Sequence, residues 1–112
     1  MASRLTLAGP VSSDDMAAAF ERTLRLCIEH DNWLVLADAT EMSAAHTVVD
    51  VYQLVTALAQ LDVQDRFREA LVAPRDAVAR ETVGFWEDAG VNRGLACKVF
   101  ATEADAVTWL LS

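Results

Sequence analysis

The 112-residue chain is poor in the residue patterns that mark catalytic, metal and nucleotide-binding sites. Its two histidines, His30 and His46, stand far apart in the sequence, and no Cys-x-x-Cys pair accompanies them. The four glycines form neither a GxGxxG fingerprint nor a P-loop, and no G-x-S-x-G nucleophile elbow occurs. We therefore expect no metal, no cofactor and no catalytic residues, and hence a protein that is not an enzyme.

Basic residues and long apolar runs are also few. Nine basic residues against 17 acidic ones give a net charge of −8, which repels phosphate backbones and anionic lipid. No apolar run approaches the roughly 20 residues that span a bilayer, and the N-terminus lacks the apolar centre of a signal peptide. We expect a cytoplasmic protein that binds neither nucleic acid nor membranes. Its many alanines and its arginines, with only one lysine, indicate a GC-rich bacterial genome.

The balance of 54% apolar and 23% charged residues predicts one globular domain over residues 1–112. A domain of this size buries enough surface to fold without metals or disulfides. Its two cysteines, Cys27 and Cys97, lie in apolar contexts, and the absence of a secretory signal indicates a reducing compartment. We expect both thiols to be inert parts of the core.

The spacing of apolar residues switches between a period of two and a period of 3.6, which predicts strands separated by helices. Strands are expected at about residues 3–8, 33–37, 67–73 and 95–101. Helical stripes are expected at 16–28, 48–58, 78–89 and 107–111, the first helix running to about His30. The order β-α-β-α-β-α-β-α implies parallel strands joined by right-handed crossovers.

Turn and capping residues set the expected boundaries of these elements. Gly9-Pro10 is expected to end the first strand, and Ala39–His46 to form a polar loop after the second. Gly90 is expected to end the third helix as a left-handed cap. Hydroxyl caps are expected at three helix starts, from Ser12 or Ser13, from Thr47 with Asp50, and from Thr102 with Asp105.

Four segments carry a further pattern when they are taken in order. They are Leu5–Pro10 (a strand, then glycine), Leu34–Thr40 (a strand ending in aspartate), Ala70–Pro74, and Asn92–Leu110 (Asn-x-Gly, a strand, Phe, then Ala-x-x-Trp-Leu). This order resembles the STAS-like domains related to the sporulation anti-sigma factor antagonist, the SpoIIAA-like group that includes bacterial STAS/SEC14-like proteins. The resemblance implies a SpoIIAA-like α/β fold with a four-stranded, mainly parallel sheet in the order 2-1-3-4.

Two features depart from that group. Its members usually begin with an extra edge strand, which we expect to be missing here, so that a sheet edge is open to pairing with another chain. Phosphorylatable members carry an Asp-Ser pair at the entry to the second helix, where this chain has Met42–Thr47. Ser43 and Thr47 are the only hydroxyls placed to substitute, and capping already explains Thr47.

The resemblance places a ligand site at the switch point between the first and third strands. The bordering loops would be Gly9–Ser13 and Pro74–Asp76, with Asp38–Thr47 beside them. The candidate ligand- or partner-binding residues are Gly9, Ser12, Ser13, Asp38, Ser43, His46, Thr47, Arg75 and Asp76. Of these, Asp38, His46, Arg75 and Asp76 could together bind a small anion or do acid–base work. Alternatively, Asp38 accepts hydrogen bonds from turn amides while His46 and Arg75 are solvated.

Three functions are compatible with these residues. The resemblance implies a non-enzymatic regulatory module that binds a protein partner, either another protein or a second copy in a homodimer. The alternative is a protein that binds a small apolar or anionic ligand, as in the SEC14-like part of the group. Trp33, Trp86 and Trp109 could line such a ligand site, or they could belong to the core or the edge of the domain. The least favoured function is an acid–base enzyme that uses Asp38 with His46.

Overall fold

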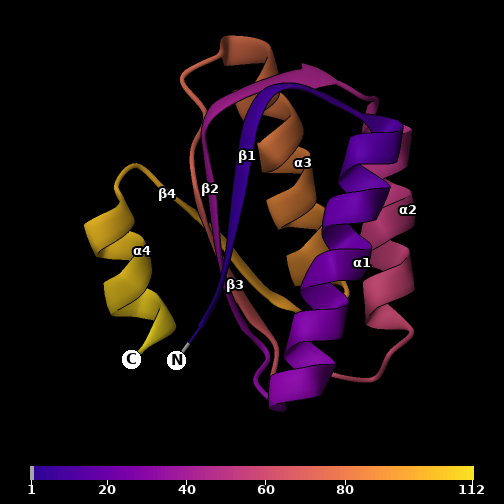
Figure 1. Cartoon of the computed structure of the whole chain (residues 1–112), viewed down its shortest axis with the longest axis vertical. Coiled ribbons are helices and arrows are strands. Elements are labelled where there is room, and N and C mark those ends of the chain that lie inside the picture. The colour runs from indigo at the N-terminus through magenta and orange to yellow at the C-terminus, as the bar shows by residue number, and fades with distance from the viewer. Residues whose placement is uncertain (1) are drawn as a thin grey trace.

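A computed structural model describes residues 2–112, in which four strands alternate with four helices (Figure 1). In chain order the elements are β1 (Ser3–Ser12), α1 (Ser13–His30), β2 (Leu34–Ala45), α2 (Val48–Ala59), β3 (Arg68–Val72), α3 (Ala77–Asn92), β4 (Ala96–Phe100) and α4 (Glu103–Leu110). All three strand pairings are parallel. The predicted α/β class and the alternation of strands with helices are confirmed.

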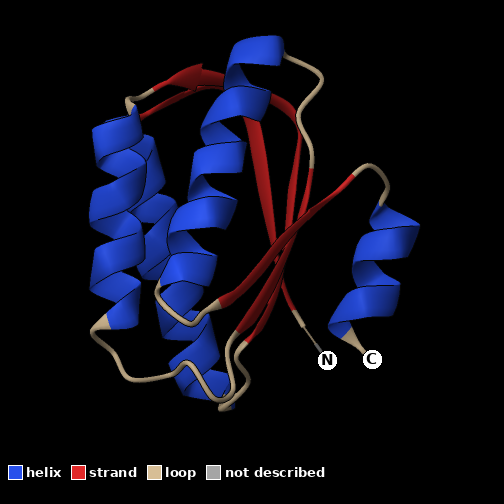
Figure 2. Cartoon of the chain, turned by 180° about the vertical axis from the view of Figure 1, so that it is seen from behind, coloured by secondary structure: helices blue, strands red, loops and turns tan. Residues whose placement is uncertain are grey.

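The elements form three layers, with the sheet in the middle. Helices α1, α2 and α3 lie on one face of the sheet and α4 lies on the other, as Figure 2 shows from behind. Within the described residues, the backbone of α1 lies close to β1 and β2, that of α3 close to β2 and β4, and that of α2 close to α1 and α3 but not to the sheet. The buried side chains of α2 (Val51, Val55 and Leu58) bridge the remaining distance and join Val35 and Cys97 of the sheet in one apolar cluster. No helix formed by residues 2–112 is long and apolar enough to cross a bilayer.

The strand order is β1-β2-β3-β4, so the expected order 2-1-3-4 is wrong. The inner position of β2 suits Leu34–Ala37, a continuous apolar run that is well covered on both faces. The outer position of β1 suits its alternation of half-buried and exposed residues and its Pro10, which edge strands tolerate. Because each strand follows its predecessor across the sheet, right-handed crossovers place α1, α2 and α3 on one face, and β1 and β3 do not form a switch point.

The first two strands are longer than expected. Gly9-Pro10 does not end β1, and the segment 39–46 is mostly strand instead of a polar loop, because the pairing resumes after a register shift between Thr6 and Ala8. Gly9 supplies a positive φ of 67° near this irregularity. Pro10 interrupts no second ladder, since β1 pairs on one side only.

The helix starts agree with the capping signals, whereas one helix end does not. The hydroxyl oxygens of Ser12, Thr47 and Thr102 each accept a hydrogen bond from the backbone N–H three residues later. Gly90 lies inside α3 and is not its cap, because the helix continues to Asn92 and the positive φ falls at Gly94. A Cβ at position 90 would come 2.6 Å from the sulfur of Cys97, so glycine lets α3 approach β4 closely.

Buried side chains fill both faces of the sheet. On the side of α4, Leu36, Ala70 and Val72 pack with Ala106 and Leu110. On the other side two apolar clusters lie under α1, α2 and α3, and Met16 and Trp86 pack against both. Cys27 and Cys97 are free, buried thiols in the first of these clusters, as expected.

Candidate functional site

Four of the nine candidate residues serve the starts of helices. The side chains of Ser12, Thr47 and Asp76 cap α1, α2 and α3 by accepting backbone N–H hydrogen bonds. Ser13 donates its hydroxyl hydrogen bond to the carboxylate of Asp50 at 2.6 Å. Each of these polar groups already has a structural partner.

Three further candidates belong to the extended β1–β2 pairing or its surroundings. Gly9 is paired with Met42, and Ser43 is paired with Pro10, so both lie within strands. Arg75 is exposed and forms an ion pair of 2.9 Å with Glu41. An exposed pair of this kind contributes little binding energy of its own.

The structure does not bring Asp38 and His46 together. Asp38 lies on the α4 side of the sheet, where Arg4 approaches it at 3.6 Å and also pairs with Glu103. Its carboxylate accepts hydrogen bonds from the hydroxyl and the backbone N–H of Thr40, which lower its pKa. His46 lines a cavity on the opposite side, under the three helices. This placement gives no support to the acid–base pair.

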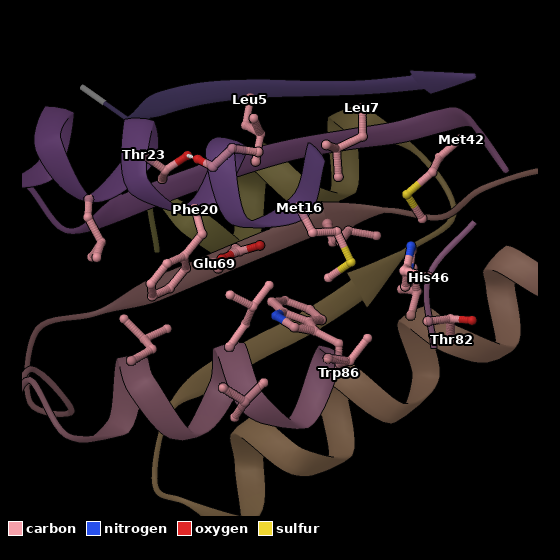
Figure 3. Close-up of a pocket in the computed structure, with 18 of the residues that line it drawn as sticks. Leu5, Leu7, Met16, Phe20, Thr23, Met42, His46, Glu69, Thr82 and Trp86 are labelled. Atoms are coloured by element: carbon pink, nitrogen blue, oxygen red, sulfur yellow. Dashed lines mark hydrogen bonds between the residues drawn. The ribbon is translucent and has the colours of Figure 1, made fainter. Parts of the chain in front are cut away.

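The cavity that His46 lines lies between the sheet and the layer formed by α1, α2 and α3 (Figure 3). Its volume is about 120 Å³. The backbone of α2 stands away from the sheet, and the apolar face of α2 forms the outer wall of the cavity. The walls come from Leu5, Leu7, Met16, Ala19, Phe20, Thr23, Leu24, Cys27, Met42, His46, Val51, Leu54, Val55, Leu58, Phe67, Glu69, Leu71, Thr82, Val83 and Trp86.

A single carboxyl group, that of Glu69, belongs to this apolar lining. Glu69 lies on β3 in register with Val35 on one side and Cys97 on the other, and both of these neighbours are buried. Figure 3 shows it in the cavity wall, to which Phe20, Met16 and Trp86 also contribute. Burial raises the pKa of Glu69 to about 8, because an apolar surrounding disfavours the charged form.

Besides Glu69 and the Cys27 thiol, the cavity wall contains one more titratable side chain, that of His46. Its Nδ1 lies 2.7 Å from the backbone oxygen of Val11. Since a carbonyl can only accept, Nδ1 carries the hydrogen and donates it. In the neutral ring Nε2 is therefore an acceptor. His46 and Glu69 lie in different parts of the cavity wall, as Figure 3 shows.

Sequence reasoning missed Glu69, although a signal was present. Phe67, Glu69 and Leu71 stand at alternate positions of the third strand and must therefore share one face. A carboxylate in that position is unusual, because the expected order 2-1-3-4 already placed this strand inside a parallel sheet. The cavity itself could not be foreseen, because it depends on how far α2 stands from the sheet.

Neither a protein-family model, nor a curated protein, nor a solved structure matches this chain. No group of three or more metal-ligating side chains gathers within residues 2–112.

Proposed function

We propose that this protein binds a small, largely apolar ligand in the cavity beneath α1, α2 and α3. The observation that carries the proposal is an apolar cavity of about 120 Å³ in a domain of only 112 residues. Protein interiors are normally packed without voids of this size, and the volume approaches the roughly 150 Å³ of an apolar cavity that binds benzene. Of the two expected ligand classes, an apolar one fits better than an anionic one, because no Lys or Arg of residues 2–112 lines the cavity.

Filling the cavity from its own wall should abolish this binding. Toluene at about ten times its Kd should stabilise the wild-type protein by about 1.4 kcal/mol, which raises Tm by about 5 °C. Ala19 lines the cavity on α1, and in Ala19→Leu the added carbons occupy the ligand's space. We expect no toluene-dependent rise of Tm in this variant, measured by differential scanning calorimetry.

Ala18→Leu is the matched control, because Ala18 is exposed on the same helix and does not line the cavity. It should keep the full toluene response of the wild type. A toluene response that survives in Ala19→Leu, or that is absent from the wild type, would count against ligand binding in this cavity.

A second candidate is a protein-interaction module whose partner is a second copy of the chain. The observation that favours it is the outer edge of β1, a ten-residue strand that pairs only with β2 among the described elements. An open strand edge presents N–H and C=O groups to another chain. We expect native mass spectrometry at micromolar concentration to show a dimer, which replacement of Thr6 by proline at the edge should weaken. A monomeric mass of 12.2 kDa across that range would remove this candidate.

A further inference from the structure

We propose that Glu69 makes the cavity selective for ligands that carry one protonated amino group on an apolar body. The carboxylate would hold the ammonium group while the apolar walls surround the rest of the molecule. This inference rests on the proposed ligand binding and names the class of ligand for the same site.

The first argument is the position of Glu69. It stands on an inner strand, opposite the helix layer, and its neighbours across the sheet are the buried side chains of Val35 and Cys97. Glu69 is half-buried, and within residues 2–112 no hydrogen bond or ion pair links its carboxyl to another group. A polar group that is partly withdrawn from water into apolar surroundings is stabilised by a partner. A ligand that donates hydrogen bonds would supply the missing partner.

The second argument is the charge of the surroundings. The cavity wall contains no Lys or Arg, so nothing in it would neutralise a ligand carboxylate or phosphate. An ammonium group would be attracted instead, because Glu69 is the one acidic side chain among the described residues of the wall. The net charge of −8 on the chain favours a cation as well. The aromatic rings of Phe20 and Trp86 line the same cavity as Glu69, and the faces of aromatic rings attract cations.

The third argument concerns the proton. With its pKa raised to about 8, Glu69 is mostly a neutral acid at pH 7. When an ammonium ion binds, the Glu69 O–H bond breaks and its proton passes to solvent, while the resulting carboxylate accepts hydrogen bonds from the ligand's N–H groups. Binding of an amine at pH 7 therefore releases close to one proton.

The other titratable groups around Glu69 do not compete for the ammonium group. Cys27 faces it from α1 and Cys97 from β4, and the pKa of each thiol is raised by burial and by Glu69 itself, so both remain neutral at pH 7. The residues that α2 contributes to the wall are all apolar. From α3 the polar members are Thr82 and Trp86, and His46 lies in another part of the wall.

Isothermal titration calorimetry with the full chain tests the inference, using benzylamine, toluene and benzoate as ligands. The wild type should bind benzylamine at least tenfold more tightly than toluene, and benzoate should not bind. Below about pH 8 the affinity for benzylamine should rise by up to tenfold per pH unit, because fewer protons must be displaced from Glu69. The affinity for toluene should not follow this rise.

Glu69→Gln should lose at least tenfold in affinity for benzylamine and should keep its affinity for toluene. Glu69→Leu, a second variant without the carboxyl, should behave in the same way. Glu21→Gln is the control for net charge, since Glu21 is exposed on α1 away from the cavity wall, and it should bind all three ligands like the wild type.

The outcomes separate this inference from the proposed function. If toluene binds but benzylamine binds no better, or binds equally well to Glu69→Gln, the selectivity for amines is wrong and the apolar site stands. If neither toluene nor benzylamine binds to the wild type, both proposals fail. Binding of benzoate with an affinity comparable to that of benzylamine would also overturn the selectivity.

Discussion

The free energy of unfolding is expected to fall as the pH rises from about 4.5 to about 8. The cause is Glu69, whose pKa is raised by burial from its ordinary 4.5 to about 8 in the folded chain. Between these two values the folded state holds a proton that the unfolded state has released, so increasing pH favours unfolding. The difference corresponds to a loss of up to about 5 kcal/mol, complete once the pH passes the folded-state pKa. Urea denaturation across this pH range measures it.

At acidic pH, the free energy of unfolding should instead fall as the pH falls. The pKa values of Asp15, Asp38 and Asp50 are lowered by hydrogen bonds to their carboxylates from Ser12, Thr40 and Ser13. Their contributions to stability are present above the ordinary value of 3.8 and are lost as the pH falls through the lower folded-state values. The two slopes together predict greatest stability near pH 4 to 5.

Glu69→Gln isolates the group responsible. This variant should show an almost flat stability between pH 5 and 8, and at pH 8 it should be more stable than the wild type by several kcal/mol. Glu21→Gln, which alters an exposed carboxyl on α1, should retain the wild-type slope. Equal slopes in the wild type and in Glu69→Gln would show that Glu69 is not held in an apolar environment.

The same carboxyl connects stability with the proposed ligand. An amine that binds the Glu69 carboxylate supplies the partner that the side chain lacks in the empty cavity. Such a ligand should therefore stabilise the protein most at pH 8, where the unliganded protein has lost the contribution of Glu69. This coupling makes the pH profile of an amine-bound sample flatter than that of the free protein.

Local sequence signals predicted the elements well because the physics behind them is local. Apolar spacing located all eight elements, and the hydroxyl caps at Ser12, Thr47 and Thr102 depend only on atoms three residues apart. Gly90 shows the limit of such signals. In the sequence it resembles a helix end, but in the structure its missing side chain leaves room for the sulfur of Cys97 on β4.

The strand order and the site depend on contacts between distant segments, which explains why they were missed. The order 2-1-3-4 came from a resemblance, and Gly9-Pro10 was expected to end the first strand. Because Pro10 instead lies within β1, it fits the edge position that the structure shows. The candidate residues were chosen from loops, where binding groups are common. The cavity instead lies under α2, and its distinctive residue, Glu69, lies inside a predicted strand from which no candidate residue was taken.

Replacing Trp86 with alanine should enlarge the cavity, and the stability of the variant protein should then depend on an added ligand. Trp86 lines the cavity and packs against both clusters beneath the helices. Removing its ring in Trp86→Ala should cost about 3–5 kcal/mol, because both the burial and the contacts of the ring are lost. The space left behind has the shape of an indole ring and adjoins the existing cavity.

Added indole should therefore restore part of the lost stability in Trp86→Ala, seen as a rise in Tm that increases with indole concentration. The matched control is Trp109→Ala, since Trp109 packs on the α4 side of the sheet, against Phe100 and beneath Arg68. That variant should also lose stability but should respond to indole no more than the wild type does. An equal response in both variants would mean that indole binds elsewhere, and no response in Trp86→Ala would mean that the helices collapse into the space. Rescue confined to Trp86→Ala would show that the helix layer keeps its distance from the sheet even when a wall is removed, as a binding cavity requires.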